Sequence, residues 1–194
     1  MRAVILRTCR SCRPEDLGAV KFNKVLYYLD MLTYANERRA VTGATYRKRP
    51  NGPASDQLLF SLRDMTRSGD LQVKDVDYYG YIKKEYVALS AEPEGVLTER
   101  ERELLDEVID FVCRQNTARS ISDYSHSLPW ELADMGGEMP YRTATLLFPM
   151  DVTPEAFEIA EKGEPFADSK SSGGMDLPLL RDFRKRILQE AGQP

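Results

Sequence analysis

The sequence has little of the chemistry that most catalytic and metal sites need. Its 194 residues include one histidine, one tryptophan and three cysteines. A Ser–His–acid triad or a histidine-containing metal site would therefore have to use His126. No Gly-rich phosphate loop, dinucleotide fingerprint or Gly-x-Ser-x-Gly elbow is present. These absences argue against the common nucleotide-binding and hydrolytic sites.

Long hydrophobic runs are also missing. The apolar run after Arg2 covers only Ala3 to Leu6, whereas a secretory signal needs about 7–15 apolar residues. No stretch approaches the roughly 20 apolar residues of a membrane-spanning helix. The formal net charge of −4 disfavours a nucleic-acid surface spread over the whole molecule. An odd number of cysteines suits a reducing compartment, so we expect a cytoplasmic protein.

The residues that are present are typical of a globular domain. The chain is 42% hydrophobic, 30% charged and 9% aromatic, as expected for one folded domain with an appendage. Apolar and turn-residue patterns predict helices over 16–39, 54–68, 98–115 and 117–124, a hairpin over 71–89, and a strand or last piece of core over 141–148. Thr98 and Glu101 predict a capping box. The expected fold class is mainly α with a small antiparallel β-hairpin (α+β).

The domain organisation follows from shifts in composition. We expect an N-terminal segment over 1–14, a globular domain over 15–150, a linker over 151–176 and a C-terminal helix over 177–194. The linker region is acidic and contains a Ser/Gly-rich stretch. The C-terminal helix is basic and carries Arg184.

The three cysteines raise the question of a metal. Cys9 and Cys12 form a CxxC, which is half of a zinc site. The other half would need Cys113, His126 or acidic residues, and none of these has a second paired spacing. No strand–CxxC–helix pattern supports a thioredoxin-like role. The preferred interpretation is ordinary thiols near a mobile N-terminus, with no metal and no cofactor.

Two further functional classes remain open from the residues alone. A helix, a second helix and a hairpin in succession is compatible with a winged-helix DNA-binding regulator, although the second helix is nearly neutral in charge. An enzyme that uses His126 is the weaker alternative, because Ser125 and Ser127 are only its sequence neighbours. We expect His126 to make a fixed hydrogen bond and Trp130 to fill a gap in the core.

The tyrosines favour a protein-binding module. Ten are present, and four lie in the predicted hairpin: Tyr78, Tyr79, Tyr81 and Tyr86. Strand alternation predicts that some of them contact the core and that others face solvent. Tyrosine is common at protein interfaces because its ring supplies area and its hydroxyl a polar group. We therefore predict that Tyr78, Tyr79 and Tyr81, with Arg184 of the C-terminal helix, contact a partner.

Ordered motifs in residues 15–148 resemble a known family. They are Phe22-Asn23-Lys24-Val25-Leu26-Tyr27 with Asp30, then Thr42-Gly43, Tyr46 and Gly52-Pro53, and later Thr117-Ala118, Ile121-Ser122, Ser125-His126 and Trp130. In this order and spacing they closely resemble the SocA-like Panacea domain, also found in GepA-like phage-associated proteins. Phe22 replaces a more usual leucine, and Pro129 precedes the tryptophan. Residues after about 150 are not covered by the resemblance.

The resemblance implies a prophage-type antitoxin. Proteins of this family neutralise a toxin encoded beside them by binding it, and the founding type is similar to an adaptor that delivers the toxin to a AAA+ protease. A cognate protein toxin is therefore the expected partner, with no cofactor and no membrane. A set of residues around the helix 16–39 is predicted to converge as a polar and aromatic cluster, either a buried network or a contact surface: Asn23, Tyr27, Asp30, Tyr46, Gly52, Pro53, His126 and Trp130. The buried network is favoured because buried polar groups need partners.

Overall fold

The computed structural model describes residues 1–147, and these form one compact unit. The main helices are α1 (Arg2–Ser11), α2 (Ala19–Glu37), α3 (Asp56–Arg67), α4 (Glu99–Ile109), α5 (Ala118–Tyr124) and α6 (Leu128–Glu131). Short helical turns are η1 (Pro14–Asp16), η2 (Asp110–Arg114) and η3 (Tyr141–Leu146), and the strands are β1 (Tyr46–Arg47), β2 (Leu71–Tyr78), β3 (Tyr81–Ala88) and β4 (Glu138–Met139). The predicted fold class, mainly α with a small antiparallel sheet, is confirmed.

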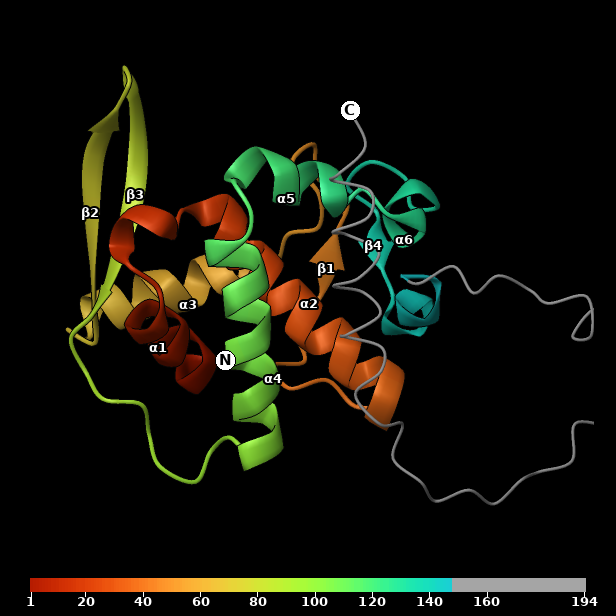
Figure 1. Ribbon diagram of the computed structural model, residues 1–194, viewed down its shortest axis with the longest axis horizontal. Helices are drawn as coiled ribbons and strands as arrows, with labels where there is room; N and C mark the ends of the chain where they lie inside the picture. Colours follow the sequence, from red (N-terminus) through yellow and green to blue (C-terminus); the bar gives the residue numbers. More distant parts are fainter. Residues whose placement is uncertain (148–194) are drawn as a thin grey trace, which may run out of the picture. The chain divides into compact units, whose positions relative to one another are not determined.

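Helix α2 lies at the centre of the unit. Helices α1, α4 and α5 and the turn η3 all pack against it (Figure 1). The helix is apolar on nearly all sides, and Phe22, Leu26 and Leu29 are completely buried. A helix without a solvated polar face is stable only when neighbouring elements cover it. The remaining elements therefore arrange themselves around α2.

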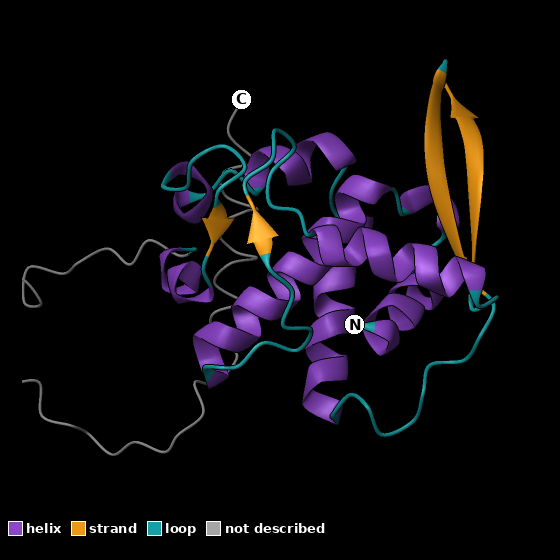
Figure 2. Ribbon diagram, turned by 180° about the vertical axis from the view of Figure 1, so that it is seen from behind, coloured by secondary structure: helices purple, strands orange, loops and turns teal. Residues whose placement is uncertain are grey.

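Two separate two-stranded sheets lie on opposite sides of the helices (Figure 2). The longer is the predicted hairpin, in which β2 and β3 pair antiparallel along their full length from Leu71↔Ala88 to Tyr78↔Tyr81. Its base docks on the helices through Tyr86, whose buried ring packs edge-to-face on Phe22 at 5.2 Å. The shorter sheet pairs β1 with β4, Tyr46 opposite Met139, and nothing in the sequence pattern predicted it.

The N-terminal residues differ from the expectation of a mobile segment. They form α1, which buries Val4, Ile5 and Leu6 completely. Arg2 also forms an ion pair with Asp70, which precedes β2. The apolar run that was too short for a signal peptide is thus one side of an amphipathic helix. Cys9 and Cys12 are consequently buried.

For residues 141–148 we expected a strand or a last piece of core, and the strand alternative is corrected. Residues Tyr141–Leu146 form the 3-10 turn η3 instead. Pro140 comes directly before it, and Thr143 bonds back to the Pro140 carbonyl, so the backbone turns at the point where a strand would continue. The turn still contributes to the core, because Ala144 is completely buried. The predicted linker 151–176 and C-terminal helix 177–194, with Arg184, lie outside the described residues.

Candidate functional site

A row of polar side chains runs along one side of α2 and faces the loop 42–55. Asn23, Lys24, Tyr27 and Asp30 follow the spacing of one helix side, and the last three are buried. Each polar group buried without a partner costs about 1–3 kcal/mol. The loop supplies partners to most of them. The amide of Ser55, for example, donates to the Asn23 side chain at 3.0 Å.

Asp30 is the most highly coordinated of these side chains. Its completely buried carboxylate accepts hydrogen bonds from the Thr42 amide at 2.7 Å, the Thr42 hydroxyl, the Tyr46 hydroxyl at 2.8 Å and the Tyr141 hydroxyl at 3.1 Å. Four donors satisfy a carboxylate, which accepts but does not donate. Asp30 therefore fixes the start of the loop and the turn η3 against α2.

The two tyrosines on Asp30 are held in their neutral form. Burial and the adjacent carboxylate both raise the pKa of Tyr46 and of Tyr141 well above the ordinary value for a phenol. The single hydroxyl proton of Tyr141 is shared between Asp30 and the nearer Ala44 carbonyl, at 2.6 Å, and its ring stacks on Tyr34. These hydroxyls act as permanent hydrogen-bond donors, which is a structural role and not that of an acid or base.

Lys24 lies one helical turn before Tyr28 on α2 and is also buried. Its ammonium donates to the Pro53 carbonyl at 2.9 Å, and desolvation lowers the pKa of Lys24 to about 7. Gly52 approaches it so closely that a Cβ there would lie 2.5 Å from Nζ and would clash with Ser125 Oγ. Gly52 adopts a φ of +84°, which glycine tolerates best. Gly52 and Pro53 thus cover the lysine with main chain.

His126 and Trp130 join α6 to the same loop. Their rings stack at 3.9 Å, and the ammonium of Lys48 lies 4.0 Å from the centre of the tryptophan ring. The indole donates to the Arg49 carbonyl at 3.1 Å. Two expectations are corrected here. The Nε2 atom of His126 is buried with no hydrogen-bond partner among the described residues, and Trp130 is half-buried because it packs on a surface loop and does not fill a core gap.

The predicted cluster therefore falls into neighbouring groups joined by the loop 42–55. Asn23 and Asp30 accept hydrogen bonds from backbone amides of this loop, and Tyr46, which lies in the loop, donates to Asp30. Tyr27 packs edge-to-face on Tyr46. The hydroxyls of Tyr27 and Ser127 lie close together without a hydrogen bond of ordinary geometry. Sequence reasoning did not select Lys24, Thr42, Ser125 or Tyr141. Lys24 and Thr42 stand in the recognised motifs, whereas no sequence signal marks Tyr141.

These groups lack the geometry of a nucleophilic site. The Ser125 hydroxyl is buried and donates to the Ser122 carbonyl at 2.7 Å, so it has no base to take its proton. Within residues 1–147 no three His, Cys, Asp or Glu side chains gather as metal ligands would. The hydrogen bonds of this arrangement hold the loop 42–55 on α2.

The end of the β2–β3 hairpin is a different kind of surface. Tyr78 is largely exposed, and the exposed fractions of Tyr79, Tyr81 and Ile82 reach 88%, 77% and 78%. We call these four residues the hairpin tip. Figure 1 shows the hairpin extending past the helices at one side of the unit. Large exposed apolar groups of this kind mark interaction surfaces when they are contiguous.

The tip has a defined backbone. Tyr79 and Gly80 both have positive φ, at 52° and 81°, and they connect the paired residues Tyr78 and Tyr81. This is the pattern of a two-residue type I′ turn, whose twist matches that of the strands. The Asp77 carboxylate accepts from the Gly80 amide at 3.1 Å. The rings are therefore presented on an ordered support.

Comparison with family models identifies the chain. The model described as "Antitoxin SocA-like, Panacea domain" matches residues 22–131, which is more than half of the 194 residues. The chain belongs to this family of SocA-like antitoxin Panacea domains. A search of curated proteins and of solved structures finds no match. In the described part of the chain, no helix has the length and hydrophobicity needed to cross a bilayer.

Proposed function

We propose that this protein is an antitoxin that neutralises a cognate protein toxin by direct binding, and that the hairpin tip contacts the toxin. The observation that carries the proposal is the exposed Tyr78, Tyr79, Tyr81 and Ile82 group on a domain of the antitoxin family. Aromatic anchors supply much of the energy of protein interfaces. Here they lie at the most extended part of the described unit, where a partner can reach them.

The buried network has a supporting role in this proposal. Asp30 and Lys24 hold the loop 42–55 on α2, and Phe22 of the same helix receives Tyr86 from the hairpin base. A rigid support reduces the ordering cost of binding. Neutralisation then needs only that the antitoxin covers the active surface of the toxin. Covalent chemistry and a cofactor have no part in it.

Further features complete the proposal. The net charge of −4 favours association with a basic toxin. Arg184, outside the described residues, is a second proposed contact, and delivery of the bound toxin to a AAA+ protease is a proposed later step. We place the protein in the cytoplasm, because an odd number of cysteines suits a reducing compartment. DNA binding is not carried forward, because Asp56 and Asp64 of α3 offset its Arg63 and Arg67.

The first experiment identifies the toxin. Each reading frame that flanks the gene is expressed alone and together with this protein. We expect one small product to stop growth alone, to be harmless in co-expression and to co-purify with the antitoxin. If no flanking product is toxic and none co-purifies, the antitoxin proposal is wrong.

The second experiment locates the contact. Tyr79→Ser and Tyr81→Ser should each weaken toxin binding by about 2 kcal/mol, roughly thirtyfold in Kd, because each removes an aromatic anchor. Val96→Ser is the matched control, since Val96 is an exposed apolar residue in the loop between β3 and α4. Titration calorimetry measures Kd, and circular dichroism checks the fold. Equal affinity of the tip variants and the wild type would move the interface elsewhere.

A further inference from the structure

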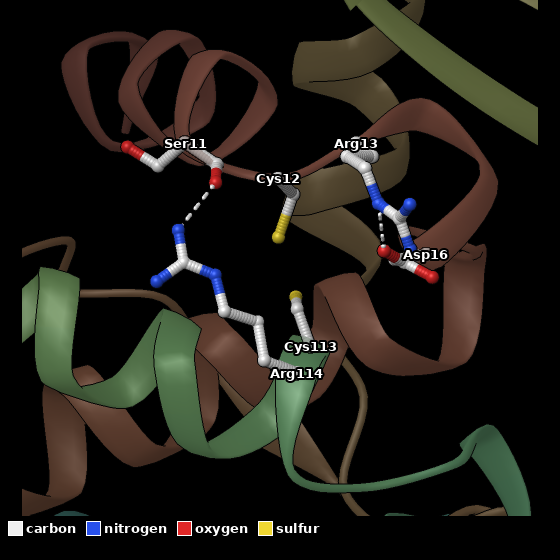
Figure 3. Close-up of a pocket in the computed structure, with 6 residues that line it drawn as sticks. All are labelled: Ser11, Cys12, Arg13, Asp16, Cys113 and Arg114. Carbon is white, nitrogen blue, oxygen red and sulfur yellow. Dashed lines mark hydrogen bonds and ion pairs between the residues drawn. The ribbon is translucent and has the colours of Figure 1, made fainter.

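Two cysteines far apart in the sequence face each other in a cavity. Cys12 follows the last turn of α1, and Cys113 lies in η2, the π-helical turn after α4. Figure 3 shows their sulfur atoms pointing toward one another. The cavity has a volume of about 450 Å³, within the range of sites for small molecules. Its lining residues are Ser11, Cys12, Arg13, Asp16, Cys113 and Arg114.

Cationic side chains hold both sides of this cavity. The Arg114 guanidinium donates to the Ser11 carbonyl at 3.2 Å and so joins η2 to the end of α1. The buried Lys21 ammonium donates to the Cys113 carbonyl at 2.9 Å. Both charges lie close enough to the thiols to favour a thiolate. The thiols themselves are buried, whereas Arg13 and Arg114 at the rim of the cavity have side chains that are 73% and 60% exposed. A reagent would reach the thiols past these two arginines.

The three thiols differ in acidity. A hydrogen bond from the Cys113 thiol lowers the pKa of Cys12, and Arg114 and Lys21 add to this effect against the opposing effect of burial. The same hydrogen bond, together with burial, raises the pKa of Cys113. Burial raises the pKa of Cys9 to about 12. Because the thiolate is the reactive form, Cys12 is the nucleophile of the three.

We propose that Cys12 and Cys113 form a thiol oxidation site that reacts with small disulfides such as oxidised glutathione and closes to an intramolecular disulfide. The Cys12 thiolate attacks one sulfur of the reagent, forms a mixed disulfide and releases one glutathione thiolate. The Cys113 sulfur then attacks Cys12 and releases the second. Two protein thiols are oxidised, one glutathione disulfide is reduced, and the two thiol protons pass to the released glutathiones.

The bond would link the end of α1 to η2 across 101 residues of chain (113 minus 12). Closing a loop of that length restricts the unfolded chain more than the folded one. The oxidised protein should therefore have a higher Tm than the reduced protein. The site is independent of toxin binding, so its test does not depend on the proposed function.

The test uses the full-length protein and oxidised glutathione. After incubation, free thiols are alkylated in denaturant, and mass spectrometry maps the products. We expect the loss of two hydrogen atoms, a linked peptide pair that contains Cys12 and Cys113, and alkylated Cys9. Cys9→Ser is the matched control and should oxidise as the wild type does. In Cys113→Ser the reaction should stop with one glutathione on Cys12, at least about tenfold faster than on Cys9.

Three results would overturn the proposal. They are a Cys9–Cys12 link, a disulfide between two protein molecules as the main product, and a native protein that stays reduced while the same protein in denaturant is oxidised. Circular dichroism of Cys113→Ser confirms folding. If this variant is unfolded, Cys113→Ala replaces it. The mixed disulfide is again expected on Cys12, but it should form more slowly because the hydrogen bond from residue 113 is lost.

Discussion

Lys24 and Asp30 are charged residues buried on the same helix, but their environments differ. Asp30 accepts four hydrogen bonds, so its charge is well compensated. Lys24 makes a single hydrogen bond to the Pro53 carbonyl within the described residues and lacks an ion-pair partner there. A buried charge with so little compensation is costly. Lys24 should therefore contribute a pH dependence to the free energy of unfolding.

We predict that Lys24→Met removes a stability gain between pH 7 and 9. The pKa of Lys24 is about 7 in the folded protein and about 10.5 when unfolded. In this window the unfolded chain binds more protons, so the free energy of unfolding rises with pH, by about 2 kcal/mol. Below pH 7 both states are protonated and the slope disappears. Urea denaturation at pH 6, 7, 8 and 9 measures it.

The difference between the wild type and Lys24→Met gives the contribution of Lys24 to the pH dependence, because the thiols and phenols titrate in both proteins. A methionine retains most of the side-chain volume without a charge. A variant that shows the same difference in stability between pH 7 and 9 as the wild type would contradict the assignment.

A second residue-scale prediction concerns Gly52. Gly52→Ala combines a strained positive φ with a steric clash against Ser125 Oγ and Lys24 Nζ. Gly43→Ala is the control, since Gly43 also has a positive φ, of +67°, but has no atom within 4 Å of the new methyl group. We expect a loss of about 1 kcal/mol for Gly43→Ala and at least about 2 kcal/mol more for Gly52→Ala. If chemical denaturation shows the same loss in the free energy of unfolding for both variants, the steric clash at Gly52 does not contribute.

The sequence could predict part of this residue-scale picture. Buried polar groups on α2 followed from its apolar sides, and their need for partners followed from the cost of burial. The identity of the partners did not follow. Tyr141 reaches Asp30 from 111 residues away, and Ser125 meets Gly52 only because α5 packs on α2. Such contacts depend on the tertiary packing.

At the scale of elements, two helix starts use the same capping motif in different surroundings. At α4 the Thr98 hydroxyl accepts from the Glu101 amide, and the buried Glu101 side chain also pairs with Arg39 at 2.6 Å. At α5 Thr117 and Ser120 form an exposed capping box. The first cap links α4 to the end of α2, whereas the second has only its own helix to stabilise.

We predict that Thr98→Ala destabilises the protein more than Thr117→Ala. The first change should lower the free energy of unfolding by about 1–2 kcal/mol, and the second by about 0.5 kcal/mol, the two ends of the range for N-caps. Urea denaturation of both variants measures the difference. Equal losses would mean that the contact between Glu101 and Arg39 does not depend on the cap.

Elements with a local signal were the ones that the sequence predicted well. The capping box at Thr98, the hairpin and the helix over 16–39 each have a pattern within a few residues. The β1–β4 pair has two residues per strand, too few for an alternation to be visible. At 141–148 the strand alternative was wrong, because Pro140 begins a turn there, whereas the alternative of a last piece of core agrees with the buried Ala144.

At the scale of the whole molecule, the N-terminal helix belongs to the core that the described residues share. Helix α1 contacts α2, α3, α4 and β3, and Arg2 pairs with Asp70. We expected a boundary between an N-terminal segment, 1–14, and the domain, 15–150. The contacts of α1 cross that boundary. The sequence suggested a separate segment because the apolar side of a ten-residue helix is a short pattern. The burial of this helix is visible only in the folded unit.

The pairing of Tyr46 with Met139 has a consequence for the timing of synthesis. A ribosome adds about 5–20 residues per second. The interval between the synthesis of β1 and that of its partner strand β4, some 90 residues later, is therefore roughly 5–20 s. Asp30 is synthesised 111 residues before Tyr141, so the interval for this contact is slightly longer. The hairpin leaves the ribosome well before the domain can close. Under the proposed function, a toxin translated at the same moment acts unopposed until the chain of its antitoxin has been made at least as far as η3.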